Sequence, residues 1–206
     1  MEFTSVNKIF EESFRKNWDR PAISNYQGIT LHYHDVAYRI EKMHIMFEHC
    51  GLQKGDKVAI CSRNQANWAV AFLSAMTYGA VPVPLLHEFK SSNIHHLVNH
   101  SEAKILFVDD VIWEGLSETE MPDLQAIIQV NTFKLLYYAN EQIVEAREHL
   151  NELFGKKYPE AFTSDDMHYY EDSAEELAVI NYTSGTSGFS KGVMVPYRAI
   201  CSNLEF

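Results

Sequence analysis

Tyr182 to Val193 read Y-T-S-G-T-S-G-F-S-K-G-V, and this stretch says more about fold and chemistry than any other part of the chain. From Thr183 to Gly192, eight of ten positions are glycine or carry a hydroxyl, and Lys191 lies among them. Glycine adopts positive φ without steric cost, so successive backbone N–H groups can turn toward one point and form a concave anion site. Hydroxyls add neutral donors, and a lysine adds a mobile charge suited to a terminal phosphate. The composition therefore predicts a loop that holds a polyphosphate.

The flanking residues predict that this loop joins two strands. Residues 177–182 read as a buried strand that enters the loop, and residues 193–195 read as a short strand that leaves it. A Walker loop has the pattern G-x-x-x-x-G-K-[ST] and runs into a helix, whereas Lys191 is followed here by Gly192 and a strand. The residues alone leave a second interpretation open, which is a flexible hairpin loop with a solvated lysine.

Two blocks of sequence resemble the adenylate-forming superfamily, the AMP-forming acyl-CoA synthetases and their relatives. The loop resembles the family's Y-T-S-G-T-T-G-x-P-K-G-V signature, and its continuation, residues 194–203, resembles the helix with Arg and Asn that follows it. The upstream block resembles a family segment that reads G-D-x-V-A-I-x-x-x-N, then W, then G-A-V-x-V-P-L. In this chain the three parts are Gly55 to Asn64, Trp68, and Gly79 to Leu85. This upstream block favours long-chain fatty acyl-CoA ligases over the adenylation domains of peptide synthetases.

Three positions depart from the family pattern. Ser187 replaces a threonine and keeps the hydroxyl, while Ser190 replaces a proline and adds a donor at some loss of rigidity. Tyr197 stands where a histidine is common, so no role of that histidine is transferred to this chain.

The resemblance implies a site and a reaction. The carboxylate oxygen of the substrate would attack the α-phosphorus of ATP, giving an acyl-adenylate and pyrophosphate. The thiolate of coenzyme A would then displace AMP to give the thioester. Lys191 would neutralise phosphate charge in catalysis, Thr186 would contact magnesium, and Tyr182 would pack at the strand end. The residues that the resemblance assigns to ATP are Thr183, Ser184, Gly185, Thr186, Ser187, Gly188, Ser190, Lys191 and Gly192.

Members of this family are much longer than this chain. Residues 1–206 are therefore expected to be the N-terminal part of the AMP-binding domain, with the C-terminal remainder absent and the segment inactive alone. Two alternatives stay open: a non-catalytic binding remnant of the fold, and another adenylate former such as an amino-acid adenylation domain.

The composition of the chain narrows the class of protein further. A formal net charge of −11 argues against nucleic-acid binding, which depends on Lys and Arg.

Three cysteines without a C-x-x-C pair suggest reduced thiols in a cytoplasmic protein. Residues 64–87 lack charged side chains, but polar residues and prolines interrupt them, so a buried helix and strand are predicted rather than a transmembrane segment. Peripheral membrane contact, oligomeric state and acyl chain length remain open.

Strands that alternate with helices after Lys57 predict a layered α/β fold with a mainly parallel, covered sheet, the N-terminal portion of the large domain of an acyl-CoA synthetase-like enzyme. We expect Asp35 and Asn67 to cap helices that follow them, and Gly155 to end a helix that begins at Glu141. The acidic run from residue 165 to residue 176 predicts a solvated linker.

The ten histidines do not predict a metal site. His32 and His34 share a strand face, and His96 and His100 lie one helical turn apart, but neither pair has an acidic or thiol third ligand in register. His87 follows the extended segment 81–85 at a position where α/β proteins place ligands, although an exposed loop is the favoured interpretation.

Overall fold

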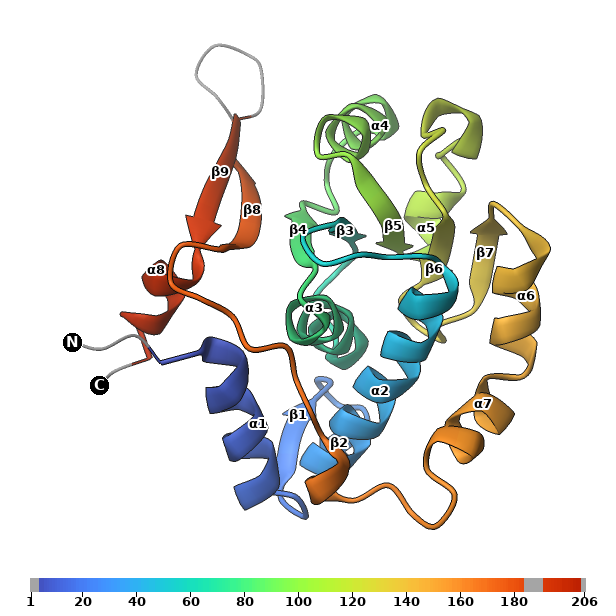
Figure 1. Cartoon of the computed structure of the whole chain (residues 1–206). Coiled ribbons are helices and arrows are strands. Elements are labelled where there is room, and N and C mark those ends of the chain that lie inside the picture. The colour runs from blue at the N-terminus through green and yellow to red at the C-terminus, as the bar shows by residue number, and fades with distance from the viewer. Residues whose placement is uncertain (1–3, 184–190, 205–206) are drawn as a thin grey trace.

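A five-stranded sheet forms the centre of the molecule. The computed structural model describes residues 4–183 and 191–204. The strands of this sheet lie in the order β4-β3-β5-β6-β7 (Figure 1), and all neighbours are parallel except β6 and β7, which are antiparallel. The fold is therefore layered α/β with a mainly parallel sheet, as the sequence predicts. The strands are β3 (Lys57–Cys61), β4 (Val81–Leu85), β5 (Ala103–Val108), β6 (Ala126–Gln129) and β7 (Leu135–Tyr138).

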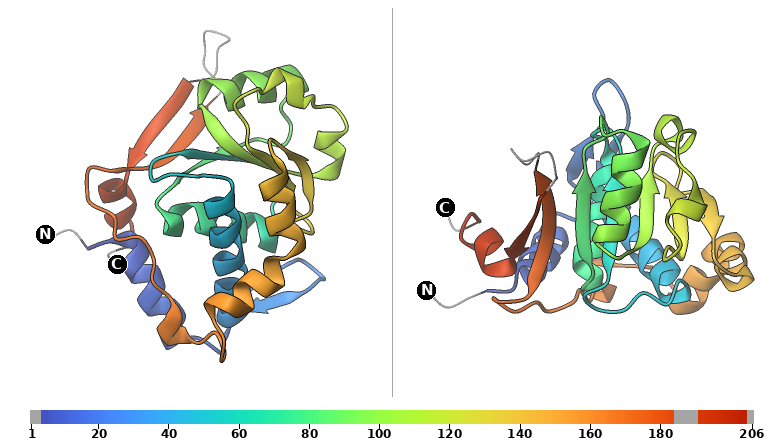
Figure 2. Two further views of the ribbon diagram at one scale, coloured as in Figure 1. Left: turned by 45° about the vertical axis from the view of Figure 1, so that its right-hand side comes forward. Right: turned by 90° about the horizontal axis from the view of Figure 1, so that it is seen from above.

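Helices cover both faces of this sheet (Figure 2). The helices are α1 (Val6–Lys16), α2 (Tyr33–His49), α3 (Ala66–Tyr78), α4 (Ser91–His100), α5 (Asp110–Trp113), α6 (Glu141–Glu148), α7 (Leu150–Lys157) and α8 (Tyr197–Cys201), with short 3₁₀ turns at Glu118–Glu120 and Ser164–Asp166.

The alternation of side chains along β3 explains the two layers. Val58 and Ile60 face a core built with α2, α3, α6 and α7, whereas Ala59 and Cys61 face a second core built with α4. Successive strand residues point to opposite faces, and a sheet covered on both sides needs apolar residues at every position. All four side chains are fully buried.

Two antiparallel hairpins flank the sheet. The first joins β1 (Pro21–Ser24) to β2 (Thr30–His32), and the second joins β8 (Leu177–Thr183) to β9 (Lys191–Pro196). Strand β8 lies beside β4 at the sheet edge, where Ile180 and Tyr182 enter the same core as Val83 (Figure 2). This packing places the β8–β9 hairpin against the parallel sheet.

Some local predictions need correction. The helix α2 begins at Tyr33, so Asp35 is its third residue, and the Asp35 carboxylate accepts a hydrogen bond from the His32 N–H, 2.9 Å away. Gln65, rather than Asn67, occupies the N-cap position of α3. Gly155 lies inside α7, because the expected long helix is divided in two near His149.

The acidic segment is not simply a solvated linker. Asp172 is 4% exposed, and its carboxylate accepts hydrogen bonds from the Ser5 hydroxyl and from the N–H groups of Val6 and Asn7, at 2.7–3.0 Å. Glu176 forms an ion pair with Lys54 at 2.7 Å. Asp172 thus joins the first turn of α1 to the segment before β8, where the helix dipole favours a negative charge.

Candidate functional site

The β8–β9 hairpin holds the two ends of the predicted phosphate loop together. Thr183 is the last residue of β8 and pairs in register with Lys191, the first residue of β9. Both are exposed. Six predicted ATP-binding residues lie in the segment 184–190, outside the described residues: Ser184, Gly185, Thr186, Ser187, Gly188 and Ser190. The described ends agree with the predicted loop between two strands.

Gly192 has a structural role at the base of this loop. It pairs with Tyr182 across the hairpin. A Cβ added at Gly192 would lie 3.2 Å from Ile180 Cγ2 and 3.2 Å from Tyr182 Cε1, which is tighter than ordinary van der Waals contact. The absence of a side chain therefore lets β9 pass directly beside a buried aromatic ring of β8.

Tyr182 lies at the end of the core, and a residue of α4 forms a hydrogen bond with its hydroxyl. Its ring is buried, and its hydroxyl shares a 2.7 Å hydrogen bond with Nδ1 of His100. Burial raises the pKa of the Tyr182 hydroxyl, so it stays protonated at neutral pH. The prediction that Tyr182 packs at the strand end is confirmed. The sequence gives no sign of this role for His100, because its contact with Tyr182 spans 82 residues of sequence.

Tyr197, which replaces a common histidine of the family pattern, fixes the other end of the hairpin. Its side chain is 2% exposed, and its hydroxyl donates to the carbonyl oxygen of Met76 at 3.4 Å. The Asn7 amide donates to the same hydroxyl, also at 3.4 Å. Burial raises the pKa of this phenol above its ordinary value. Tyr197 therefore links α8 to α1 and α3.

One cluster of possible metal ligands is present among the described residues. His32, His34 and Asp35 each offer one ligand atom, and these atoms lie within 4.8 Å of one another. The prediction that this pair of histidines has no acidic third ligand is wrong, because the start of α2 carries the Asp35 carboxylate next to both rings. That carboxylate already caps the helix through the His32 N–H. The cluster lies on the β2–α2 junction and belongs to no part of the phosphate loop.

A cavity of about 360 Å³ lies at the carboxyl ends of the parallel strands. Its lining includes Arg63, Gln65, His87 and Asp109. The Asp109 carboxylate accepts hydrogen bonds from the Arg63 N–H at 2.8 Å and from the Gln65 amide at 3.1 Å. His87 is exposed, as the sequence predicts, and it borders the crevice where open α/β sheets bind ligands.

Among residues 4–183 and 191–204, no helix has the length and apolarity needed to cross a bilayer.

Comparison with known proteins finds similarity to a fatty-acid–CoA ligase and to a surfactin synthase subunit. The chain is 26% identical over 216 residues to a long-chain-fatty-acid–CoA ligase of Salmonella typhimurium, covering 98% of this chain and 38% of the ligase. It is 26% identical over 196 residues to surfactin synthase subunit 2 of Bacillus subtilis, covering 95% of this chain and 5% of that protein. The chain thus spans less than two fifths of the length of these relatives.

Solved structures share the fold. The anthranilate CoA ligase AuaEII, solved in complex with anthranoyl-AMP, superposes with a TM-score of 0.73 at 17% identity, over 95% of this chain and 34% of that one. The family model described as AMP-binding enzyme matches residues 10–206, which include both the upstream block and the entire glycine and hydroxyl loop. The chain belongs to the AMP-binding enzyme family, whose members form adenylates.

Proposed function

We propose that this chain is the ATP-binding N-terminal part of an AMP-forming acyl-CoA synthetase that acts on a long-chain fatty acid. The observation that carries the proposal is the hairpin register, which pairs Thr183 with Lys191 and so brings a lysine to the mouth of a loop rich in glycine and hydroxyl groups. Family membership supports ATP as the substrate whose phosphates this loop binds.

Within this proposal, the chemistry is mainly positioning and charge stabilisation. Backbone N–H groups of the loop would hold the β- and γ-phosphates, and the Lys191 ammonium would offset negative charge as pyrophosphate leaves. The hydroxyl of Thr186 is a hard oxygen ligand, which suits magnesium. Magnesium, when bound, would neutralise phosphate charge. Coenzyme A would enter only in the second half-reaction, as the thiol that displaces AMP.

A second candidate is an amino-acid adenylation domain. Surfactin synthase subunit 2 matches 95% of this chain at the same identity as the fatty-acid ligase. We favour the fatty-acid ligase because the upstream block, Gly55 to Leu85, is more similar to the pattern of long-chain acyl-CoA ligases.

The test is a carboxylate panel in the pyrophosphate–ATP exchange assay, using an enzyme that extends this chain to the length of its relatives. Long-chain fatty acids should support exchange, and coenzyme A should then release AMP and acyl-CoA. Exchange with amino acids alone would support the second candidate. No exchange with any carboxylate would support a non-catalytic binding remnant.

The activity of residues 1–206 by themselves is a separate question. We propose that they do not catalyse exchange, because the relatives are much longer and the acyl site would be incomplete. Robust exchange by the purified chain with any of several fatty acids would contradict this.

A further inference from the structure

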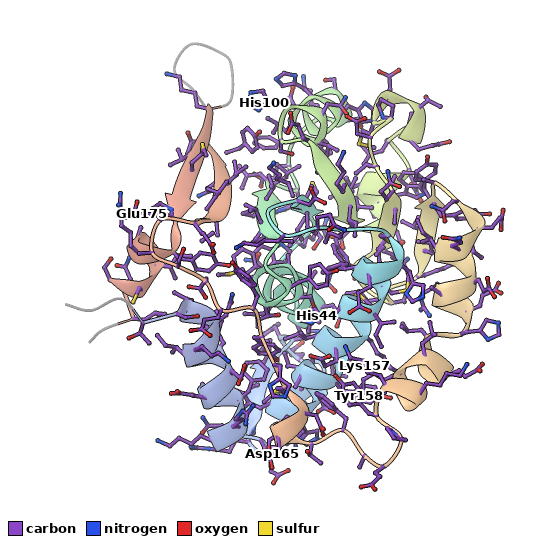
Figure 3. All side chains as sticks on the ribbon, viewed as in Figure 1. His44, His100, Lys157, Tyr158, Asp165 and Glu175 are labelled. Carbon is purple, nitrogen blue, oxygen red and sulfur yellow. The ribbon has the colours of Figure 1, made fainter. Side chains whose placement is uncertain are left out.

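A second cavity, which no residue of the strands β8 and β9 lines, contains buried polar groups that the proposed reaction does not use. It measures about 360 Å³ and lies between α2, the end of α3 and residues 157–170. Figure 3 shows His44, Lys157 and Tyr158 near one another, away from the strands β8 and β9. The inner wall includes the buried side chains of Glu41, His44 and Tyr169, and the rim includes exposed residues.

The hydrogen bonds of His44 define which ring nitrogen carries its proton. Nε2 lies 3.1 Å from the Ser74 carbonyl oxygen, which can only accept, so Nε2 carries the hydrogen. Nε2 is also 3.1 Å from the Thr77 hydroxyl, which already donates to the Leu73 carbonyl oxygen. Burial lowers the pKa of His44 to about 3, so the ring is neutral at physiological pH. Nδ1 is therefore an acceptor with a free lone pair.

Glu41 presents a second acceptor beside it. The side chain is 4% exposed. Its Oε2 atom accepts a 2.7 Å hydrogen bond from the Tyr158 hydroxyl and lies 3.5 Å from the Lys157 ammonium. Its Oε1 atom lies 3.7 Å from Nδ1 of His44, and neither of these two atoms has a hydrogen-bond donor among the described residues. Neither atom is fully shut off from solvent, and two acceptors that face each other beside a cavity favour a ligand that supplies a shared donor.

The other residues that line this cavity favour a positively charged ligand. Three carboxylates surround the cavity, from Glu41, Glu48 and Asp166, against one ammonium group, from Lys157. Tyrosine rings also line it, and their faces attract cations. Four tyrosines take part: Tyr78, Tyr158, Tyr169 and Tyr170.

We propose that this cavity binds a small primary ammonium compound, whose nitrogen donates to both Glu41 Oε1 and His44 Nδ1. A nitrogen about 2.9 Å from each atom spans a 3.7 Å gap with ordinary hydrogen-bond lengths. A primary ammonium has three N–H donors, so it can satisfy both acceptors and still contact a tyrosine ring. A hydrocarbon or aryl group on that nitrogen fits the remaining volume, which lies in the range of small-molecule pockets.

The experiment is calorimetric titration of the purified chain with benzylammonium, in parallel with benzyl alcohol and benzoate of the same shape. Benzylammonium should bind, and the other two should bind at least tenfold more weakly, because only the ammonium supplies charged donors. Glu41→Gln should weaken benzylammonium binding about tenfold or more, while Glu152→Gln on the exposed face of α7 should leave it unchanged. Equal binding of the alcohol, preferential binding of benzoate, or no binding of benzylammonium would each overturn the proposal.

A second measurement covers the case in which the Glu41 variant does not fold. In the unmodified chain, benzylammonium should shift the Nδ1 resonance of His44 in a nitrogen-15 spectrum, because that nitrogen gains a donor. The exposed ring of His149 serves as an internal reference and should not shift. If the His44 resonance stays in place at saturating benzylammonium, the ligand does not occupy this site.

Discussion

The hydroxyl of Tyr182 lies 2.7 Å from Nδ1 of His100, and this contact joins the last residue of α4 to the end of β8. The proposed phosphate loop begins two residues after Tyr182. A hydrogen bond between the helix and the strand therefore fixes the position from which the loop starts.

Removal of this hydrogen bond should cost little stability but should slow adenylation. Tyr182→Phe and His100→Ala are each expected to destabilise the chain by about 0.5–1 kcal/mol, and the double variant by no more than one of them. In the longer enzyme, both should slow adenylate formation, because the loop is less well positioned. The control is His96→Ala, whose ring neighbours His100 at 5.8 Å but does not contact Tyr182 through a hydrogen bond in the described part of the chain. Fully additive effects on stability would contradict the contact.

Two glycines should respond to alanine with opposite signs. Gly192→Ala would place a Cβ 3.2 Å from the Tyr182 ring and from Ile180, so we expect destabilisation by about 1–3 kcal/mol in urea unfolding. Gly155 lies inside α7, and a Cβ there meets no atom within 4 Å. Gly155→Ala should therefore stabilise the chain by about 0.5–1 kcal/mol through helix propensity. A neutral or stabilising Gly192→Ala would mean that the hairpin does not close over Tyr182.

Asp172 should contribute to stability, whereas Asp165 in the same acidic run should not. Asp172→Asn converts a buried carboxylate with three donors into an amide that cannot accept all three hydrogen bonds, and it should cost about 2–3 kcal/mol. Asp165 has a 92% exposed side chain, so Asp165→Asn should change the unfolding free energy by less than about 0.5 kcal/mol. Equal effects of the two variants would support the simple linker that the sequence predicts.

Acid should destabilise the chain through His44. Its folded-state pKa of about 3 is below the ordinary 6.5, so between these values the unfolded state binds a proton that the folded state does not. The stability is fully present above pH 6.5 and is lost as the pH falls below it. The groups that face the ring include Glu41 on the same helix, Lys157 on α7, and Thr77 and Tyr169.

The measurement is urea unfolding of the unmodified chain and of His44→Gln at pH 7 and pH 4.5. The unmodified chain should lose about 2–3 kcal/mol more than the variant over this range, because carboxylates titrate in both and cancel in the difference. An identical loss in both chains would show that His44 takes up its proton in the folded state.

The sequence predicts the parts of this fold that local periodicity controls. The strands β3, β4 and β5 are marked by apolar runs, and Gly79, which is left-handed with φ of 86°, ends α3. The strand β7 was missed, because Leu135 to Tyr138 is short and becomes a strand only by pairing with β6. Helix starts were misplaced by two or three residues, since Asp35 can cap a helix either before its first turn or within it.

The candidate site, too, has parts that the sequence predicts and parts that it does not. The glycine, hydroxyl and lysine residues of the loop motif stay a prediction as phosphate ligands, whereas the residues that position the two strands beside the loop are distant in sequence. Asp172 and Ser5 are separated by 167 residues, and Tyr182 and His100 by 82. No spacing rule relates such pairs, because tertiary packing alone brings them together. Glu41 and His44 are close in sequence, on one helix. They line a cavity only because residues 157–170 pack beside that helix.

The most direct test of the phosphate-loop proposal is to measure the two half-reactions of Lys191→Ala in an enzyme of the relatives' length. Adenylate formation from ATP and a fatty acid should slow by about a hundredfold, because a charge that stabilises the departing pyrophosphate is lost. Thioester formation from preformed acyl-adenylate should be nearly unchanged, and the exposed control Lys134→Ala should affect neither step. Equal slowing of both half-reactions, or no slowing of adenylation, would contradict the assignment of this loop to the phosphates of ATP.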